Sequence, residues 1–308
     1  MVLPSLALLA QTGLPMILCG KPFARALVKN LPNHQFVEFG GKVSSDVKSL
    51  KAVLPKNKKR LRGLLFPDSL TSAMVFKLSG ISSLGYRDDG RSLLLRWPIH
   101  KPQNPTHAVM KWYGLIQAAQ MAWHFKTHAP LPEKPAPYCF VPDIQAQTEV
   151  RNLLKENALT QGQYILIAPT ATGLHKGKIK VWPHFAELTQ QLLAAGFKVV
   201  MCPPAHESEQ AKQAAPDAQL LSPLGLEAFC ELARQAAFVV CNDSGVSHLS
   251  ALVQANQLTL FGVTSPAHTA PWSEHAECLG SLNAWPEIDV VLQRCLTMLK
   301  LQNAASSL

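Results

Sequence analysis

Several widespread sequence signatures are missing from this chain of 308 residues. The glycine pattern G-x-G-x-x-G does not occur, which argues against a dehydrogenase that binds a dinucleotide through that turn. None of the seven cysteines forms a C-x-x-C pair, and no D-x-D or His/Cys cluster has the spacing of metal ligands. The sequence therefore predicts no structural zinc, no bound metal, no cofactor and no disulfide framework, which fits a reducing compartment.

Long hydrophobic runs are also scarce. The first twenty residues are apolar, but they lack the basic start of a signal peptide, and Pro4, Gln11, Gly13 and Pro15 interrupt any membrane-spanning helix. A helix followed by a buried strand fits this segment better. No other run is long enough to cross a membrane, and we expect a cytoplasmic protein.

Acidic residues are fewer than basic ones: 20 Asp and Glu face 29 Lys and Arg, a formal charge of +9. This excess indicates an anionic partner. Much of it lies in a short stretch that contains Lys51, Lys56, Lys58, Lys59, Arg60 and Arg62. No aromatic residues alternate with these, which disfavours nucleic acid. A phosphorylated glycolipid at the inner face of the cytoplasmic membrane fits the charge, and a solvated loop without a partner fits it equally well.

Strands and helices alternate along both halves of the chain, which predicts an α/β fold with two parallel, doubly wound sheets. The expected strands are 16–19, 36–39, 61–66, 83–86, 164–168, 198–202, 219–221, 238–241 and 258–261. The longer expected helices are 107–124, 183–195, 207–215, 226–236 and 245–253.

A proline-rich stretch separates the two halves. The composition predicts an N-terminal Rossmann-like domain over 1–130, a linker over 131–148 and a C-terminal Rossmann-like domain over 149–285. An amphipathic helix and a small polar tail are expected over 286–308.

The segment from Phe238 to Trp272 has the order strand, turn, helix, strand and loop. Asn242, Asp243, Ser244 and Gly245 break the first apolar run with residues that cap helices or form tight turns. A helix that starts there would direct free amides and a partial positive charge towards the carboxyl edge of the sheet, which suits a diphosphate.

This segment resembles the signature of glycosyltransferase family 9, the lipopolysaccharide heptosyltransferases, with N-D-[ST]-G-x-x-H-L-x-A followed by L-F-G-x-T-x-P. The matching positions include Asn242, Asp243, Ser244, Gly245, His248, Leu249, Ala251, Phe261, Gly262, Thr264 and Pro266. The resemblance implies a GT-B fold, in which two Rossmann-like domains face each other across a cleft. It also implies an inverting, metal-independent glycosyltransferase with ADP-heptose as donor and the lipopolysaccharide core on lipid A as acceptor.

Lys180 is the candidate catalytic cation. It lies in a segment that resembles the family's Lys-x-Trp-Pro pattern, just before a helix that starts near Pro183. Lys176 and Lys178 are close enough to replace it, and a plain surface lysine is the alternative interpretation. Thr170, in the loop after the preceding strand, would offer a hydroxyl and an amide to phosphate.

The remaining donor-side candidates lie near the same turn. Ser244 and Gly245 are expected to bind the diphosphate, and Asp243 to orient the turn, cap the helix or hold a sugar hydroxyl. His248 and Thr264 would contact phosphate or each other, with an interior histidine as the alternative. The resemblance places a ribose-binding acid near Glu207, although the local sequence is divergent.

The N-terminal half shows one departure from the family. Met1 to Leu6 matches the segment that normally follows a first strand and a Gly-Asp loop, so that strand and the acidic base of the loop are expected to be absent. A start codon placed about fifteen residues too late or a lost base would explain this. Asp68 is the substitute considered. Arg87 and Arg91 resemble the family's acceptor-side arginines, with exposed loop arginines as the alternative.

The resemblance implies a heptosyltransferase II-like enzyme that acts on a glycolipid at the inner membrane surface, and the charge pattern disfavours nucleic acid. The alternatives are a GT-B transferase that uses another nucleotide sugar, such as a UDP-sugar, and a non-catalytic homologue that binds a sugar nucleotide.

Overall fold

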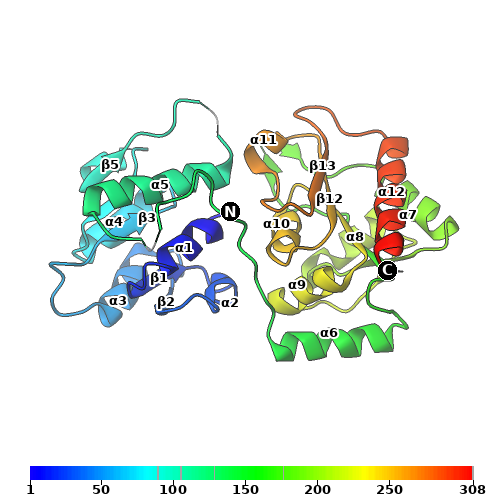
Figure 1. Cartoon of the computed structure of the whole chain (residues 1–308), viewed down its shortest axis with the longest axis horizontal. Helices are drawn as coiled ribbons and strands as arrows, with labels where there is room; N and C mark the ends of the chain where they lie inside the picture. Colours follow the sequence, from blue (N-terminus) through cyan, green and yellow to red (C-terminus); the bar gives the residue numbers. More distant parts are fainter. Residues whose placement is uncertain (89, 105, 128, 176, 307–308) are drawn as a thin grey trace. The chain divides into compact units, whose positions relative to one another are not determined.

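The computed structural model describes residues 1–306 except 89, 105, 128 and 176 (Figure 1). The chain divides into two compact units, Met1–Tyr138 and Cys139–Leu308. The boundary lies inside the proline-rich segment that was predicted as a linker. Each unit contains parallel strands and helices, so the predicted α/β class is confirmed.

The C-terminal unit is built on a sheet of six parallel strands in the order β10-β9-β6-β11-β12-β13. This is the Rossmann order 3-2-1-4-5-6, and the strand order reverses between β6 and β11. The strands are β6 (Tyr164–Ala168), β9 (Lys198–Met201), β10 (Gln219–Leu220), β11 (Phe238–Asn242), β12 (Gln257–Phe261) and β13 (Ala276–Gly280). All five residues of β11 and of β12 are buried, as the apolar runs predict.

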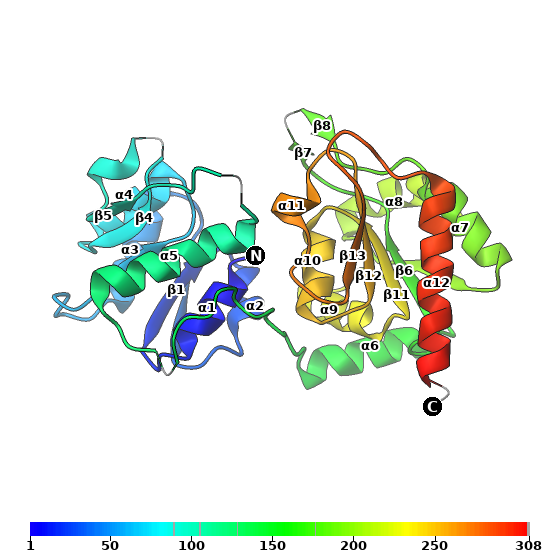
Figure 2. The same cartoon turned by 45° about the horizontal axis from the view of Figure 1, so that its top comes forward.

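Helices cover both faces of this sheet. They are α6 (Ile144–Glu156), α7 (Phe185–Ala194), α8 (Ser208–Ala214), α9 (Leu226–Gln235), α10 (Gly245–Leu252), α11 (Pro266–Thr269) and α12 (Ile288–Ser306). Figure 2 shows α7 and α12 side by side on one face, with α9 and α10 on the other. The core on the α7 and α12 face joins Ile165, Phe238, Leu258 and their neighbours to Leu188 and Val291.

Three elements of this unit differ from the sequence-based expectation. The helix α6 begins inside the predicted linker, where Asp143 caps it by accepting a hydrogen bond of 2.8 Å from the Ala146 amide. The strand β13 was not expected, and it pairs with β12 along its whole length. A short antiparallel pair, β7 (Leu174–His175) and β8 (Lys178–Ile179), interrupts the loop after β6.

The N-terminal unit contains two parallel sheets. One pairs β1 (Met16–Gly20) with β2 (His34–Glu38), and the other has the order β3-β4-β5, with β3 (Gly63–Leu65), β4 (Ser83–Tyr86) and β5 (Trp97–Ile99). The helices are α1 (Leu3–Ala10), α2 (Ala24–Val28), α3 (Val43–Val53), α4 (Leu70–Leu78) and α5 (Ala108–Trp123). Sequence periodicity predicted one sheet, and β5 was not predicted.

The helices connect the two sheets of this unit. On the basis of the contacts between elements, α1 packs against α5, and α3 packs against both β2 and α4. Side chains of β1, including Ile17 and Cys19, join a core with Leu50 of α3 and Val75 of α4. Among the described strands, β1 pairs only with β2, and β3 pairs only with β4. Each of these two strands therefore has one unpaired edge. Of the helices the structure describes, none is long and apolar enough to cross a membrane.

Candidate active site

The expected donor-side residues gather at the carboxyl edge of the C-terminal sheet. Thr170 follows β6, Glu207 follows β9, and Thr264 follows β12. Asp243 follows β11, directly beside the point where the strand order reverses. Ligands of open parallel sheets bind at this edge and at this reversal, so the topology alone makes the edge the candidate site.

The turn after β11 ends in the N-terminus of α10. Ser244 caps this helix by accepting a hydrogen bond of 3.3 Å from the Val246 amide, and the Ser247 hydroxyl donates to the Ser244 carbonyl at 2.8 Å. Gly245 opens the helix, and a Cβ atom added there would meet no heavy atom within 4 Å. The amide end of α10 is therefore approachable, and it carries the partial positive charge that favours an anion.

Asp243 is fixed inside this turn. Its carboxylate Oδ2 accepts hydrogen bonds from the hydroxyls of Thr264 and Thr269, the latter at 3.2 Å. The residue is 4% exposed, and both hydroxyls come from the β12 side of the site. Asp243 thus ties the two neighbouring loops of this edge together. The role of Thr269 was not predicted, because it lies outside the matched motif.

Lys180 reaches the same turn from the loop after β8. Its Nζ donates a hydrogen bond of 2.7 Å to the Asp243 main-chain oxygen and lies 3.8 Å from Asp243 Oδ2. The side chain is 23% exposed, so part of it remains accessible from solvent. Lys178 donates instead to Asn283 at 3.1 Å, and Lys176 lies outside the described residues. Of the two lysines described here, Lys180 is the one beside the α10 N-terminus.

A buried anchor holds Lys180 in place. Trp182 is 1% exposed, its amide donates to Asn242 Oδ1 at 2.9 Å, and its indole Nε1 donates to the Pro286 carbonyl at 2.9 Å. The Asn242 side chain also donates to the Ala168 carbonyl at 3.3 Å. Asn242 therefore connects the loops after β6, β8 and β11, a positioning role that explains an asparagine at the start of the motif.

Thr170 and Glu207 contact each other. The Thr170 hydroxyl donates to Glu207 Oε2 at 2.6 Å, and both residues are buried. This bond joins the ends of β6 and β9 across the site. His248 lies one turn into α10 and is half-buried. Around the described residues, no group of three or more His, Cys, Asp or Glu side chains is placed to hold a metal ion.

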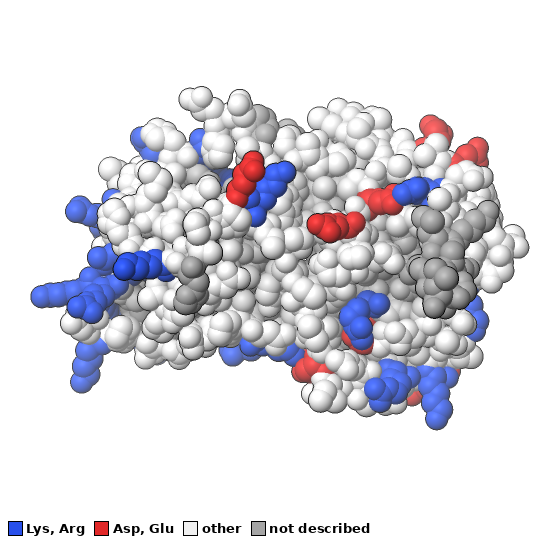
Figure 3. Space-filling view, in the orientation of Figure 1, with Lys and Arg blue, Asp and Glu red and all other residues white. Residues whose placement is uncertain are grey.

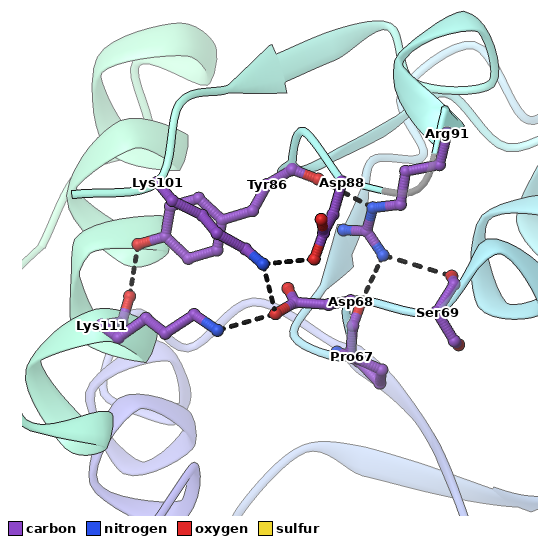
Figure 4. A network of polar contacts seen from close by, with 8 residues as sticks. All are labelled: Pro67, Asp68, Ser69, Tyr86, Asp88, Arg91, Lys101 and Lys111. Carbon is purple, nitrogen blue, oxygen red and sulfur yellow. Dashed lines mark hydrogen bonds and ion pairs between the residues drawn. The ribbon is translucent and has the colours of Figure 1, made fainter. Parts of the chain in front are cut away.

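The corresponding edge of the N-terminal unit carries a network of charges (Figure 4). Asp68 Oδ2 lies 2.7 Å from Lys111 Nζ and 3.2 Å from Lys101 Nζ, and Lys101 also pairs with Asp88. These residues follow β3, β4 and β5 or lie in α5, so four segments meet here. Lys111 Nζ stands 4.3 Å from the centre of the Trp112 ring, a favourable cation–π position. Burial and the Asp68 charge raise the pKa of nearby Tyr86 to about 12.

Arg91 has a different place from the one expected. It is fully buried, and its guanidinium donates to the carbonyls of Tyr86, Pro67 and Ser69. These bonds hold the loop on both sides of Asp68, so Arg91 positions that loop and does not face an acceptor. Arg87 is exposed and contacts Ser92 and His100, which leaves it accessible to a ligand.

Asp68 also differs from the expectation of a substitute base. Its Oδ2 is shared by two ammonium groups, and its Oδ1 is buried. With Oδ2 held by two ammonium groups, Asp68 is the centre of an ion-pair network and is not presented as a free base. Lys101 and Lys111 were not singled out from the sequence, because they lie in separate segments and only the fold brings them to one carboxylate.

The α/β fold matches that of GT-B glycosyltransferases, as comparisons with known proteins show. The chain belongs to glycosyltransferase family 9 (heptosyltransferase), whose model matches residues 56–299. It is 27% identical over 230 residues to lipooligosaccharide heptosyltransferase 2 of Haemophilus influenzae. That match covers 69% of this chain but only 63% of the relative, less than two thirds of its length.

Solved structures show the same fold along nearly the whole chain. The Escherichia coli ADP-heptose lipopolysaccharide heptosyltransferase II aligns over 98% of this chain and 95% of its own, with a TM-score of 0.74 and 21% identity. Escherichia coli heptosyltransferase WaaC with ADP aligns over 92% of this chain and 99% of its own, with a TM-score of 0.63 and 19% identity. The predicted family and GT-B fold are confirmed.

Proposed function

We propose that this protein transfers a heptose from ADP-heptose to the inner core of lipopolysaccharide, with inversion at the anomeric carbon. One observation carries the proposal: Lys180 and the open N-terminus of α10 lie side by side at the strand reversal. Negative charge grows on the leaving diphosphate as the glycosidic bond breaks, and a cation with a helix N-terminus stabilises that charge.

Each donor-side residue has a part in this proposal. Lys180 neutralises the diphosphate, and Ser244 and Gly245 present the α10 amides to it. Asp243 positions both Lys180 and the loop that contains Thr264, because it accepts a hydrogen bond from each. Thr170 and Glu207, paired at 2.6 Å, line the side of the site next to β9, where a ribose hydroxyl would donate a hydrogen bond to the Glu207 carboxylate. His248, one turn into α10, would contact the phosphate or the loop of Thr264. No metal ion is required by this arrangement of charges.

The donor identity rests on the relatives. Heptosyltransferases with ADP or named for ADP-heptose share the fold, and the curated relative is named a heptosyltransferase 2. The phosphate loops do not read the base, so a UDP-sugar donor is the competing assignment. Equilibrium binding of ADP, UDP and GDP separates the two.

On the acceptor side, we place the phosphorylated inner core near Lys101, Lys111 and Arg87. An ammonium group has three donors, so the two lysines keep donors for an anionic sugar while Asp68 holds them. The partly buried Trp112 beside Lys111 adds an aromatic surface for a sugar ring. The acceptor is anchored in lipid, and we place the enzyme in the cytoplasm, peripheral to the inner face of the membrane.

A non-catalytic homologue that binds ADP-heptose is the second candidate. It is favoured by the N-terminal edge, where Asp68 and Asp88 are both ion-paired with lysine. The experiment is a transfer assay with ADP-heptose and heptose-deficient lipopolysaccharide, with released ADP and the modified acceptor measured together. Transfer supports the enzyme. ADP binding without transfer supports the homologue, and failure to bind ADP contradicts both.

A further inference from the structure

The strongest concentration of charge on the molecule lies in the N-terminal unit, away from the polar network of Figure 4. Residues 40–67 contain eight lysines and arginines and one acid, a net charge of 8 − 1 = +7, whereas the whole chain carries +9. The single acid, Asp46, is buried and accepts hydrogen bonds from the amides of Gly40 and Gly41. It therefore presents no carboxylate to a partner.

Three segments present this charge together. Lys48 and Lys51 lie on the exposed face of α3, and the loop that follows adds further exposed basic side chains. Lys58 donates to the Ser79 carbonyl at 2.9 Å, which brings the loop against the end of α4, where Lys77 is exposed. We define the basic patch as Lys48, Lys51, Lys56, Lys58, Lys59, Arg60, Arg62 and Lys77. Figure 3 shows Lys and Arg gathered over this end of the N-terminal unit.

The basic patch lies at the opposite end of the β3-β4-β5 sheet from the carboxyl edge that carries the polar network of Figure 4. The loop 54–62 precedes β3, and the end of α4 precedes β4, so both lie at the amino ends of parallel strands. Asp68, Lys101 and Lys111 lie beyond the carboxyl ends of β3, β5 and their neighbours. The patch is therefore a second basic surface, separate from the groups placed near the acceptor.

We propose that the basic patch docks the protein on an anionic lipid surface. Six of its eight basic residues are lysines, whose ammonium groups act as compact point charges, whereas bidentate recognition of phosphate favours arginine. Residues 42–62 contain no aromatic side chain on which nucleic-acid bases would stack. Leu78, 55% exposed beside Lys77, adds an apolar contact at the rim. Lysines beside an exposed leucine suit a bilayer of acidic phospholipids.

This inference deepens the proposed function, since a lipid-anchored acceptor requires the enzyme at the membrane, yet its test needs no turnover. The full chain is mixed with vesicles of phosphatidylglycerol and phosphatidylcholine, or of phosphatidylcholine alone, and the bound fraction is measured by sedimentation. We expect binding to the anionic vesicles only, weakening as ionic strength rises. Each lysine near an anionic surface strengthens binding about fivefold.

The test variant is Lys51→Glu/Lys56→Glu/Lys59→Glu, and its matched control is Arg151→Glu/Lys155→Glu/Lys212→Glu. All six positions are exposed, and the two variants change the net charge equally. The patch variant is expected to bind anionic vesicles at least about a hundredfold more weakly, and the control less than tenfold. Equal loss in both variants would assign the effect to net charge and overturn the proposal.

Additional controls separate loss of folding, loss of the donor site and binding to nucleic acid from lipid docking. ADP titration of the wild type and of each variant reports on the donor site in the C-terminal unit. Failure of the wild type to bind ADP would refute the proposed function, whereas vesicle binding is judged separately among variants that still bind ADP. If the triple variant does not fold, the three single reversals take its place, each with a several-fold expected loss. Wild-type protein that ignores anionic vesicles, or that binds duplex DNA more tightly than vesicles at equal salt, would overturn lipid docking.

Discussion

The ammonium of Lys180 donates a hydrogen bond of 2.7 Å to the main-chain oxygen of Asp243 and lies 3.8 Å from the carboxylate of the same residue. The carboxylate is in turn held by the hydroxyls of Thr264 and Thr269. A cation, a buried anion and a helix N-terminus are therefore held together at one place. Stabilisation of a departing diphosphate requires charges and dipoles that are fixed in this way.

The buried carboxylate of Asp243 should contribute to stability as well as to geometry. Asp243→Ala leaves two hydroxyls without their acceptor and is expected to lower the free energy of unfolding by about 2–4 kcal/mol. Thr269→Val removes one bond of the same network and should cost only about 1 kcal/mol. Denaturant titration followed by far-ultraviolet circular dichroism measures both. Equal stability of the two variants would contradict the role given to Asp243.

Arg91 and Arg87 should separate a structural arginine from an accessible one. Arg91→Leu leaves the carbonyls of Pro67, Ser69 and Tyr86 without their donor, and we expect a loss of about 3 kcal/mol or more in unfolding free energy. Arg87→Leu, at an exposed position, should change stability by no more than about 0.5 kcal/mol. Urea titration of the two variants gives the comparison. The reverse order of stabilities would show that Arg91 is misassigned.

Structure was predicted correctly from the sequence where the signal lies in a short, continuous motif. The motif around Asp243 and Ser244 predicted a strand, a capped turn and a helix, and the structure has β11, Ser244 as cap and α10. The buried strands of the C-terminal unit were predicted for the same reason, since apolar runs of four or five residues between turn residues leave little choice.

It failed where long-range pairing decides the outcome. The strand β13 contains Glu277 and Cys278 and reads as a loop, but its backbone is paired to β12. Arg91 and Arg87 are four residues apart in one loop, and only the fold shows that one is buried and the other exposed. The meeting of Lys101 and Lys111 at Asp68 likewise depends on three strands packing in order.

Lys111 should affect the acceptor and not the donor. Lys111→Met keeps a side chain of similar length but removes the charge that lies beside Asp68 and over the Trp112 ring. We expect the KM for heptose-deficient lipopolysaccharide to rise about tenfold, as for the loss of a charge-assisted hydrogen bond, while the Kd for ADP stays within about twofold. Steady-state kinetics and calorimetry provide the two values. A change confined to ADP binding would contradict an acceptor-side position.

The cysteines provide a test of burial by pH. All seven are free, and burial raises the pKa of Cys241 to about 12, so its thiol stays protonated at pH 8. The reactive thiolate is therefore formed at Cys241 only as the pH approaches 12, whereas Cys139 is exposed to solvent. Iodoacetamide at pH 8 should label Cys139 within minutes and leave Cys241 intact, as read by peptide mass spectrometry. Rapid labelling of Cys241 in folded protein would refute its placement in the core.

The central claim is that Lys180 and the N-terminus of α10 form a diphosphate site for an ADP-sugar, and calorimetric titration tests it most directly. Wild-type protein and the variants Lys180→Ala and Lys178→Ala are titrated with ADP, UDP and GDP in the presence of a chelator. We predict ADP-selective binding, a loss of roughly tenfold or more in affinity for Lys180→Ala from the missing charge-assisted bond, and no comparable loss for Lys178→Ala. Binding of ADP by Lys180→Ala as tight as by wild type would contradict the account.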